Sequence, residues 1–555
     1  MAKPTLAIYG IKDRNSGGYP CHVHDHNICL MQDGQVLQYL HLERYTRKKF
    51  DNRLDSYIEQ LIDEGLLSLP DDFDIVSVNN FVGNAFISDK GRLRIESTNY
   101  RTLSNCLENA RGYLQYSDRG MELTAYNSPH ELAHVFSVLP FCEDLLDNSL
   151  LVSFDGGSSL GNYSAFLYQN GKIKLIENNW RELGDAAKLF NSNVLMFKTL
   201  GIDARTHNSF PGKLMGFASW GCYDEKIKSW LVQNDFFKDY WNRDNEILES
   251  IKTVFNKSAV FQTKDSFMQD VASTMQHIFE ESVIGKMEFL QQKYKCDNLY
   301  YGGGGALNIV TNTRIVESGL FKNVFIAPCC NDSGLSIGAA ALLELQKGNK
   351  IRMHSPYLNN IGLYDNEMHS VSLELIKKVA RIIMAKGIVG VCNGYGEAGP
   401  RALGNRSLIA LPNDKQLSQR LSMQVKKREW YRPIAPIMLK KVAQRACVQR
   451  LSPLSKYMLS DFEIKHEFDE ALCGIIHVNQ TARIQTLESE EDNPFMFNLL
   501  TYLYENYGVM ALINTSFNVQ GEPIVHTKSD ALASAKKMGI DAVVFNNKLI
   551  DREDF

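Results

Sequence analysis

The sequence lacks the features that mark secreted, membrane-spanning and nucleic-acid-coating proteins. Its eleven cysteines are odd in number and contain no Cys-x-x-Cys pair, so neither a zinc ribbon nor a disulfide framework is indicated. No apolar run approaches the length of a membrane span, and the residues after Met1 show no signal-peptide pattern. The 60 Lys and Arg nearly balance the 64 Asp and Glu, so the whole chain is no polyanion binder. We expect a cytoplasmic protein in which any anion site is local.

What the chain does contain is the composition of a large globular protein and a repeated hairpin pattern. Its 555 residues are 44% hydrophobic and 22% charged, which suits roughly three to four structural units or two large lobes. Asp33-Gly34 and Asn170-Gly171 each separate two apolar runs, and these dipeptides favour type I′ hairpins. Each hairpin follows a strand-like run, at 5–9 and at 150–154. A duplicated unit of this kind is typical of actin-like and sugar-kinase ATPase lobes, although such hairpins are common elsewhere too.

A change in pattern divides the chain in two. Residues 345–366 lose sustained periodicity and contain Gly, Pro, Asn and charged residues, which is typical of a connection between lobes. We therefore predict a first domain over 1–350, a linker over 351–370 and a second domain over 371–555. The helical run and the apolar strand that open the second domain make it α/β as well.

A histidine pair lies at the start of a predicted helix. Ser128 and Glu131 have the spacing of a capping box around Pro129, which would start the helix at this point. His130 and His134 are then four residues apart on one face, close enough for both imidazoles to reach one metal ion. Taken alone, such a pair is more often two ordinary surface or core histidines.

Two aspartates at strand ends favour the metal interpretation. Asp155 follows the run 150–154, and Asp332 follows the run 323–328. Carboxylates at the ends of strands in an open sheet point into the ligand crevice. Two histidines with two aspartates suit Fe(II), Mn or Zn better than calcium. The alternative for Asp332 is the N-cap of the helix that follows it.

Two further segments predict anion binding. Four consecutive glycines, Gly302 to Gly305, stand between an apolar strand and a helix, where main-chain N–H groups can approach a phosphate; a plain tight turn is the alternative. Between Arg401 and Arg432 there are eight basic residues and two acidic ones. Such a run is usually a solvated face, but its Gly and Pro residues allow a loop that turns guanidinium groups inward toward an anion.

Together these segments resemble the O-carbamoyltransferases of the nodulation-factor, cephamycin and tobramycin type. The resemblance extends over nearly the whole chain. It implies an N-terminal actin-like lobe of the duplicated ASKHA type and a C-terminal YrdC-like α/β lobe. It rests on Gly399-Pro-Arg-Ala-Leu-Gly-Asn-Arg-Ser407, residues 425–436, Ile513-Asn-Thr-Ser-Phe-Asn518, and Gly303-Gly-Gly-Ala-Leu-Asn308 with Asp332-Ser-Gly.

The resemblance implies a reaction in two steps. In the YrdC-like lobe, carbamoyl phosphate and ATP with Mg2+ would give carbamoyl-adenylate and pyrophosphate. In the actin-like lobe, an acceptor hydroxyl would attack that anhydride and release AMP. The residues implied for the first step are Arg401 and Lys426, both catalytic, with Arg432, Arg483, Ser516 and Asn518. Those implied for the second step are Lys213, Gly303, Gly304, Gly305 and Asn308 around the nucleotide, His24 as the base, and His130, His134, Asp155 and Asp332 around a divalent metal, Fe2+ ahead of Mn2+ or Zn2+.

Departures from the family pattern leave the acceptor open. Residues 19–27 contain three histidines in place of a single His-Asp pair, so His22 or His26 could replace His24 as the base. A hydroxymethylated nucleotide or base in DNA or RNA is the alternative to a small-molecule acceptor; the basic residues 44–49 favour it and the net charge of −4 weighs against it. A sugar-kinase-like phosphotransferase is a third hypothesis. A homodimer stays open.

Overall fold

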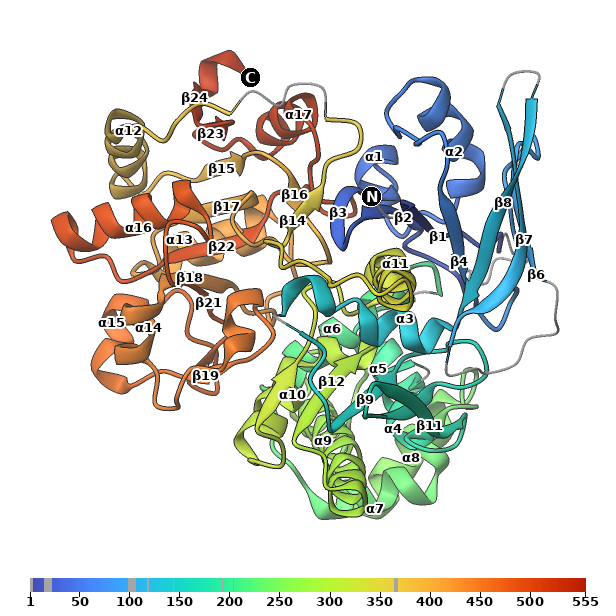
Figure 1. The fold of residues 1–555 in the computed structure, drawn as a ribbon. Helices are drawn as coiled ribbons and strands as arrows, with labels where there is room; N and C mark the ends of the chain where they lie inside the picture. The colour runs from blue at the N-terminus through green and yellow to red at the C-terminus, as the bar shows by residue number, and fades with distance from the viewer. Residues whose placement is uncertain are drawn as a thin grey trace.

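Three large sheets organise the chain into two lobes (Figure 1). The first lobe contains a ten-stranded and a five-stranded sheet, and the second lobe contains a seven-stranded sheet. Within the ranges that the structure describes, no helix is both long and apolar enough to cross a bilayer. The computed structural model describes residues 3–13, 22–97, 106–116, 119–142, 144–191, 193–202, 204–363 and 368–555.

The two sheets of the first lobe repeat one strand order. In the ten-stranded sheet the central strands are, in order, β3 (Gln35–His41), β2 (Asn27–Gln32), β1 (Thr5–Tyr9), β4 (Asp74–Val78) and β8 (Arg119–Ser128). The five-stranded sheet repeats this order with β11 (Lys172–Asn179), β10 (Tyr163–Gln169), β9 (Ser149–Phe154), β12 (Asn298–Gly302) and β13 (Asn323–Phe325). In each sheet the first three strands are antiparallel and the last three are parallel. The predicted duplicated, actin-like lobe is therefore confirmed.

Both predicted hairpins are present. The turn residues Asp33 and Gly34 have φ values of 49° and 72°, and Asn170 and Gly171 have values of 53° and 71°. A type I′ turn requires a positive φ at both central positions, and Asn, Asp and Gly tolerate it best. Gly34 is needed for a second reason, because a Cβ at this position would lie 1.9 Å from the main-chain oxygen of Lys350.

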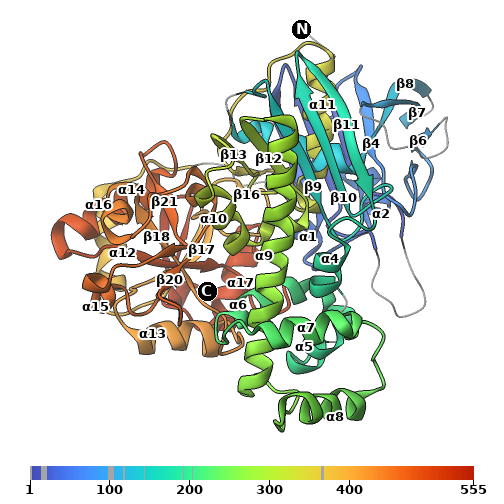
Figure 2. The same ribbon diagram turned by 90° about the horizontal axis from the view of Figure 1, so that it is seen from below.

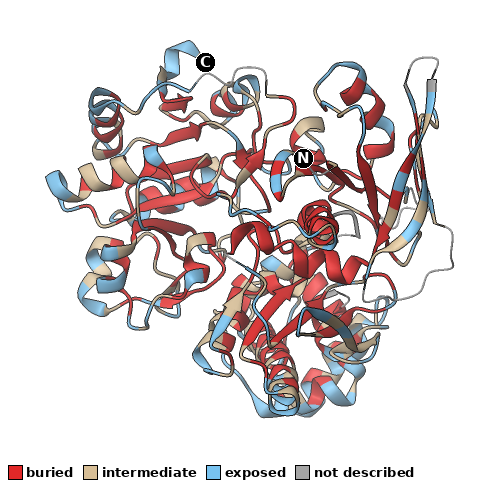
Figure 3. Cartoon of the chain, viewed as in Figure 1, coloured by how far each residue is buried: buried red, intermediate tan, exposed pale blue. Residues whose placement is uncertain are grey.

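Two helices lie between the paired sheets (Figure 3). Helix α11 (Leu335–Gln346) packs on β1, β2 and β4, whereas α3 (His130–Phe136) packs on β9 and β12. Every residue of α3 is buried, and α11 is buried from Leu335 to Glu344. They approach so closely that a Cβ at Gly338 would lie 1.8 Å from the main-chain oxygen of Ala133. The histidines predicted as metal ligands are therefore on a helix whose position is set by close packing.

The remaining elements of the first lobe flank these layers. Three further strands, β7, β6 and β5, extend the first sheet beyond β8. The long helix α9 runs beside the second sheet (Figure 2), with Phe279 stacked on Phe154. Their bounds are β5 (Phe86–Ile87), β6 (Leu93–Ser97), β7 (Glu108–Tyr116), α1 (Leu42–Thr46), α2 (Leu54–Asp63), α4 (Gly184–Asn191), α5 (Val194–Thr199), α6 (Phe210–Ala218), α7 (Glu225–Gln233), α8 (Asp244–Phe255), α9 (Ser266–Tyr294) and α10 (Ile309–Glu317).

The second lobe is a mixed sheet with its own apolar core, which confirms the predicted α/β class. Its strand order is β21 (Gln485–Leu487), β18 (Ala435–Leu439), β22 (Leu512–Ser516), β17 (Arg406–Ala410), β15 (Val389–Cys392), β23 (Ala542–Phe545) and β24 (Lys548–Asp551). The helices of eight or more residues in this lobe are α12 (Leu373–Met384), α16 (Pro494–Tyr507) and α17 (Lys528–Met538).

Main-chain pairing joins the lobes. Strand β14 (Tyr357–Asn359), inside the predicted linker, pairs with β3 at the edge of the first sheet. Strand β16 (Gly396–Glu397), beyond the linker, pairs with β14 and so extends the same sheet. The connection is therefore part of a sheet over these residues, while residues 364–367 lie outside the described ranges. The proposed domain limits of 350 and 371 remain predictions.

Replacing Gly338 with Ala should destabilise the protein. The added methyl group meets a main-chain oxygen at 1.8 Å, so α3 and α11 have to move apart. We expect the free energy of unfolding, measured by urea denaturation, to fall by about 1–3 kcal/mol. Gly285→Ala in α9 is the matched control, because a Cβ there meets nothing within 4 Å; it should raise stability by about 0.5–1 kcal/mol. Equal effects of the two substitutions would contradict the packing argument.

Candidate active site

Four side chains meet at the edge where strands of both sheets end. His130 and His134 come from α3, Asp155 follows β9, and Asp332 opens the short turn before α11. The two Nε2 atoms lie 3.0 Å apart, and the carboxylate oxygens lie 3.4 to 3.7 Å from them. One ligand atom from each residue lies within 4.8 Å of all the others. The four residues predicted as metal ligands therefore converge, and metal binding itself stays a prediction.

The burial of this cluster makes its charges interdependent. Burial opposes a charge on His130, but Asp155 and Asp332 outweigh it and raise the pKa of the imidazole to about 10. Conversely, burial opposes ionisation of Asp155, whereas the two histidines hold its pKa well below the usual range. His130 Nδ1 lies 3.1 Å from the main-chain oxygen of Asn79 and donates to it, so in the neutral imidazole Nε2 is the nitrogen that would coordinate a metal. Two facing imidazole nitrogens and two carboxylates fit a divalent cation of the Fe, Mn or Zn kind.

The predicted capping box at the start of α3 is wrong. Ser128 is the last residue of β8 and pairs with Val78, and Pro129 has an extended ψ of 134°, so the helix begins at His130. The carboxylate of Glu131 instead accepts the main-chain N–H groups of Ser159 and Leu160 at 2.9 and 3.3 Å.

The loop after Asp155 takes the place of that cap. The Ser159 hydroxyl accepts the N–H of His130 at 3.1 Å, which satisfies one of the free donors of the helix start. Because Glu131 also binds this loop, α3 is fixed by contacts about 30 residues away in the sequence. A local motif could not reveal them.

Asp332 is held from three sides and caps no helix. Its Oδ2 accepts the Tyr9 hydroxyl at 2.9 Å, and its main-chain oxygen accepts Asn27 Nδ2 at 2.8 Å. The Asn27 side chain also accepts the N–H of Ser336 in α11. Gly334, rather than Asp332, occupies the N-cap position of α11. The N-cap alternative is therefore wrong, because the carboxylate points toward the histidines.

Of the three candidate bases, His24 lies beside this cluster. Its Nδ1 is 3.0 Å from Asp25 Oδ2 and 4.0 Å from Asp332 Oδ2. Burial opposes its charge, but the two aspartates raise its pKa to about 9. His26 is buried and burial lowers its pKa to about 3, whereas the exposed His22 has its ring against Phe81. Residues 19–21 of the motif lie outside the described ranges.

The glycine run packs against the metal-ligand cluster. A Cβ at Gly302 would lie 2.7 Å from the main chain of His134, and one at Gly304 would lie 2.7 Å from Asp155 Oδ1. Gly303 has a φ of 93° and would place a Cβ 2.2 Å from the oxygen of Phe154. The N–H of Gly304 donates to Asp155 at 2.8 Å. Close approach requires these glycines, and phosphate binding by the remaining N–H groups stays a prediction.

Two other residues predicted to contact nucleotide have partners within the protein. Asn308 is the N-cap of α10, where its side chain accepts the N–H of Thr311 and also bonds with Gln276. Lys213 in α6 forms an ion pair of 2.7 Å with Glu429 of the second lobe. Lys213 therefore connects the lobes at the basic segment, and its contact with a nucleotide stays a prediction.

Arg401, Arg428, Arg432 and Arg483 form a half-buried cluster in the second lobe, with little matching negative charge among the described residues. Burial lowers the pKa of Arg401 to about 10 and that of Arg428 to about 9, and the guanidinium of Arg432 acts in the same direction on both. Burial and these three arginines hold the pKa of Arg483 well below its usual value. The Nε atoms of Arg401 and Arg483 have no hydrogen-bond partner. Among the described residues, the acidic partner that forms an ion pair with this cluster is Glu429, 3.4 Å from Arg432. Such a cluster favours an anionic ligand.

Sequence reasoning named Lys426 with Ser516 and Asn518, which contact it in the structure, but did not single out Arg428. Lys426 Nζ donates to the main-chain oxygens of Ser516 and Asn518 at 2.5 and 2.6 Å, and to Asn518 Oδ1 at 2.6 Å. Burial lowers its pKa, and Arg428 and Lys49 add to this. Arg428 belonged to the basic run, but the run alone did not indicate which members turn inward.

The arginine cluster borders the first lobe. Gly399 has a φ of 97°, and a Cβ there would lie 2.2 Å from the main-chain oxygen of Pro328, just before Asp332. Arg44 donates to the oxygen of Gly399 at 2.9 Å, and Arg47 donates to the oxygens of Pro523 and Ile524. These two basic residues therefore join the lobes. They do not form the polyanion-binding face that residues 44–49 suggested.

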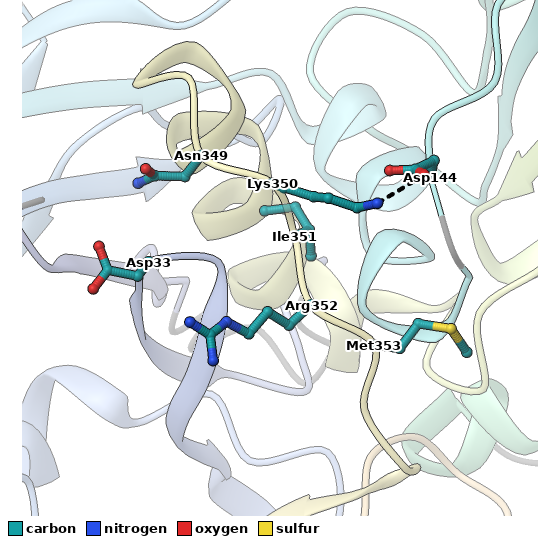
Figure 4. A pocket seen from close by; sticks show the side chains of 7 residues that line it. All are labelled: Asp33, Asp144, Asn349, Lys350, Ile351, Arg352 and Met353. Atoms are coloured by element: carbon teal, nitrogen blue, oxygen red, sulfur yellow. Dashed lines mark hydrogen bonds and ion pairs between the residues drawn. The ribbon is translucent and has the colours of Figure 1, made fainter.

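A surface hollow lies apart from both clusters (Figure 4). It has a volume of about 610 Å³ and is polar at its rim, where Lys350 pairs with Asp144 at 3.0 Å. It shares no residue with the metal-ligand cluster or the arginine cluster. Its lining residues are Asp33, Asp144, Asn349, Lys350, Ile351, Arg352 and Met353.

The chain is similar to several known proteins. The chain is 26% identical to the uncharacterized protein MJ1051 of Methanocaldococcus jannaschii, over 96% of this chain and 99% of that protein. It is also 26% identical to the 3'-hydroxymethylcephem-O-carbamoyltransferase of Amycolatopsis lactamdurans, over 78% of this chain and 82% of that protein. A solved structure of full-length HypF in the phosphate- and nucleotide-bound form aligns with a TM-score of 0.34 and 14% identity, over 63% of this chain and 56% of that one.

Two family models match the chain in the order expected from its lobes. The model of the carbamoyltransferase N-terminus matches residues 85–341 and includes all four members of the metal-ligand cluster. The model of the carbamoyltransferase C-terminus matches residues 380–552 and includes the arginine cluster. Together they span most of the chain. The protein belongs to the carbamoyltransferase family.

Proposed function

We propose that this carbamoyltransferase uses ATP and carbamoyl phosphate to form carbamoyl-adenylate in the second lobe, and then carbamoylates a hydroxyl of a small molecule in the first. One observation supports this most: an excess of half-buried guanidinium groups in one lobe borders the segment that leads to the His2Asp2 cluster in the other. The first site suits phosphates, and the second suits a cation and a proton acceptor. A two-step transfer needs both, side by side.

The first step requires charge stabilisation at phosphate. Arg401, Arg428, Arg432 and Arg483 present more positive charge than Glu429 neutralises. Bound phosphates would supply the missing negative charge, and preorganised cations stabilise the charge that develops on them in the transition state. Lys426, held by Ser516 and Asn518, adds a further cation at the same place. Mg2+ would enter with ATP, and the YrdC-like character of this lobe belongs to the proposal.

The second step requires a proton acceptor for the attacking hydroxyl. His24 Nδ1 lies 3.0 Å from Asp25 Oδ2 and donates to it, so in the neutral imidazole Nε2 is the atom that would accept that proton. His130, His134, Asp155 and Asp332 would hold a divalent metal, Fe2+ ahead of Mn2+ or Zn2+, which supplies Lewis acidity beside the carbamoyl group when bound. Tyr9 and Asn27 keep Asp332 in place.

We propose a small-molecule alcohol as the acceptor. One relative is named for a hydroxymethyl group on a small ring system, and we extend that kind of acceptor to this protein. The nucleic-acid alternative loses its main support, because Arg44 and Arg47 donate to main-chain oxygens of the second lobe. The third hypothesis, a sugar-kinase-like phosphotransferase, would release ADP instead of AMP and pyrophosphate, so the nucleotide product distinguishes the two reactions.

Pyrophosphate release tests the first step. Wild-type protein with ATP, Mg2+ and carbamoyl phosphate should release pyrophosphate, detected by a coupled phosphatase assay. Arg401→Met should lower the rate by about 100- to 1,000-fold, because a preorganised cation at the phosphates is lost. Arg420→Met, an exposed member of the same basic run, is the control and should keep the wild-type rate. No pyrophosphate, or ADP as the nucleotide product, would contradict the proposal.

The stability of the arginine cluster gives an independent test. Arg483→Met removes a half-buried charge that has no acidic partner among the described residues, so in anion-free buffer the free energy of unfolding should rise by about 1 kcal/mol. Added pyrophosphate should stabilise the wild-type protein and have little effect on this variant. Urea denaturation with and without pyrophosphate measures both. Equal stabilisation of the two proteins by pyrophosphate would place the anion elsewhere.

Metal content tests the ligand cluster. Wild-type protein loaded with Fe2+, Mn2+ or Zn2+ and then desalted should retain an equimolar amount by elemental mass spectrometry. His134→Ala should retain little, because one of four converging ligands is lost. The control His277→Ala changes a half-exposed histidine outside the cluster and should bind as the wild type does. Retention of metal by His134→Ala would disprove this site.

A further inference from the structure

One buried carboxylate bridges two histidines next to the metal-ligand cluster. Asp25 Oδ2 lies 3.0 Å from His24 Nδ1, and Asp25 Oδ1 lies 2.9 Å from His41 Nε2. Asp25 and His41 are each 3% exposed, whereas His24 is half-buried and faces Asp332 at 4.0 Å. The sequence motif pointed to His24 and Asp25 but gave no indication of His41, which is 16 residues further along.

Contacts with the main chain fix both His41 and Asp25. His41 is the last residue of β3, pairs with Asn27 of β2, and donates its N–H to Asn359 Oδ1 at 2.8 Å. Asp25 has a φ of 55°, and its main-chain oxygen accepts Asn27 Nδ2 at 2.6 Å. The same Asn27 side chain binds the main chain at Asp332. The bridge is therefore built on the frame that holds the metal-ligand cluster.

The hydrogen bonds define which nitrogen atoms carry protons. An ionised carboxylate only accepts, so His24 donates Nδ1–H and His41 donates Nε2–H to Asp25. His24 Nε2 is the ring nitrogen that Asp25 does not hold, and in the neutral imidazole it carries the lone pair. Without His41, Oδ1 of the buried Asp25 would lose its donor, which costs about 1–3 kcal/mol and frees the carboxylate to rotate. Glu43 also lies within reach, but its carboxylate accepts the N–H of Phe50 at 3.0 Å.

We infer that His41 is a positioning residue for the transfer step: it holds Asp25 so that Asp25 keeps His24 in the tautomer and orientation that accept the acceptor's proton. The inference rests on the proposed function. In the step it serves, the acceptor oxygen forms a bond to the carbamoyl carbon, and the bond from that carbon to the phosphate oxygen breaks. AMP leaves with the electron pair of that bond, and the hydroxyl proton moves to His24 Nε2. His41 touches neither substrate nor nucleotide.

Two variants separate positioning from packing. His41→Leu keeps the volume but removes the donor, whereas the side-chain amide of His41→Gln can donate to the same Asp25 oxygen. Methanol serves as the acceptor probe, since the smallest primary alcohol needs no dedicated pocket and yields methyl carbamate, measured by mass spectrometry. Pyrophosphate release without an acceptor reports the first step in the same samples. His354→Leu is the control, a histidine of the predicted linker that accepts the N–H of Val36 in the first lobe.

His41→Leu should lower the rate of methyl carbamate formation by about 10- to 100-fold, as loss of an outer partner of a catalytic group does, and leave the pyrophosphate rate unchanged. His41→Gln should recover most of the loss, and His354→Leu should match the wild type. A wild-type rate in His41→Leu, equal losses in the Leu and Gln variants, or a parallel loss of pyrophosphate would each overturn the inference.

The inference and the proposed function can fail separately. Wild-type protein that releases no pyrophosphate would overturn the proposed function. Wild-type protein that releases pyrophosphate but forms neither methyl carbamate nor AMP would remove the transfer step that His41 is inferred to serve. Normal activity in both steps with an unaffected His41→Leu variant would overturn the role of His41 alone.

Discussion

Two carboxylates removed from water, Asp155 and Asp332, are the constraint on which the first lobe depends. Charges buried in this way persist only when opposite charge and hydrogen bonds surround them. The fold supplies both: His130 and His134 face the carboxylates from α3, Gly304 donates to Asp155, and a tyrosine hydroxyl donates to Asp332. The duplicated sheets matter because they end at one edge, so that loops far apart in sequence deliver these groups to one point.

The second lobe has an excess of positive charge at its arginine cluster. Residues 41–49 of the first lobe connect this cluster to the metal-ligand cluster. His41 supports Asp25 at one end of this segment, Arg44 and Arg47 donate to main-chain oxygens of the second lobe, and Lys49 lies close enough to lower the pKa of Lys426. Three of these four contacts are hydrogen bonds of defined geometry. The spacing between the arginine cluster and the histidines is therefore set by backbone positions and the pairing of β14 with β3, and salt should disturb it little.

Sequence patterns predicted those features whose physical cause lies in neighbouring residues. The Asp33-Gly34 and Asn170-Gly171 turns formed because their backbone angles suit few other residues, and the four metal-ligand candidates converged because each follows a strand or opens a helix at one sheet edge. The capping box failed because Ser128 is paired within a sheet and Glu131 binds a distant loop. His41 and β14 were missed for the same reason. Their partners, Asp25 and β3, are defined by the tertiary fold and leave no signal in neighbouring residues.

The glycine run shows how one pattern can have a cause other than the expected one. Four glycines between a strand and a helix suggested a phosphate loop, since backbone approach to a ligand needs the missing Cβ. Here Gly302 faces the main chain of His134, Gly303 faces Phe154, and Gly304 faces Asp155, all closer than a methyl group allows. The run is thus required before any nucleotide binds. A substitution there would displace α3 or Asp155 first, so loss of activity in such a variant would by itself say nothing about phosphate binding.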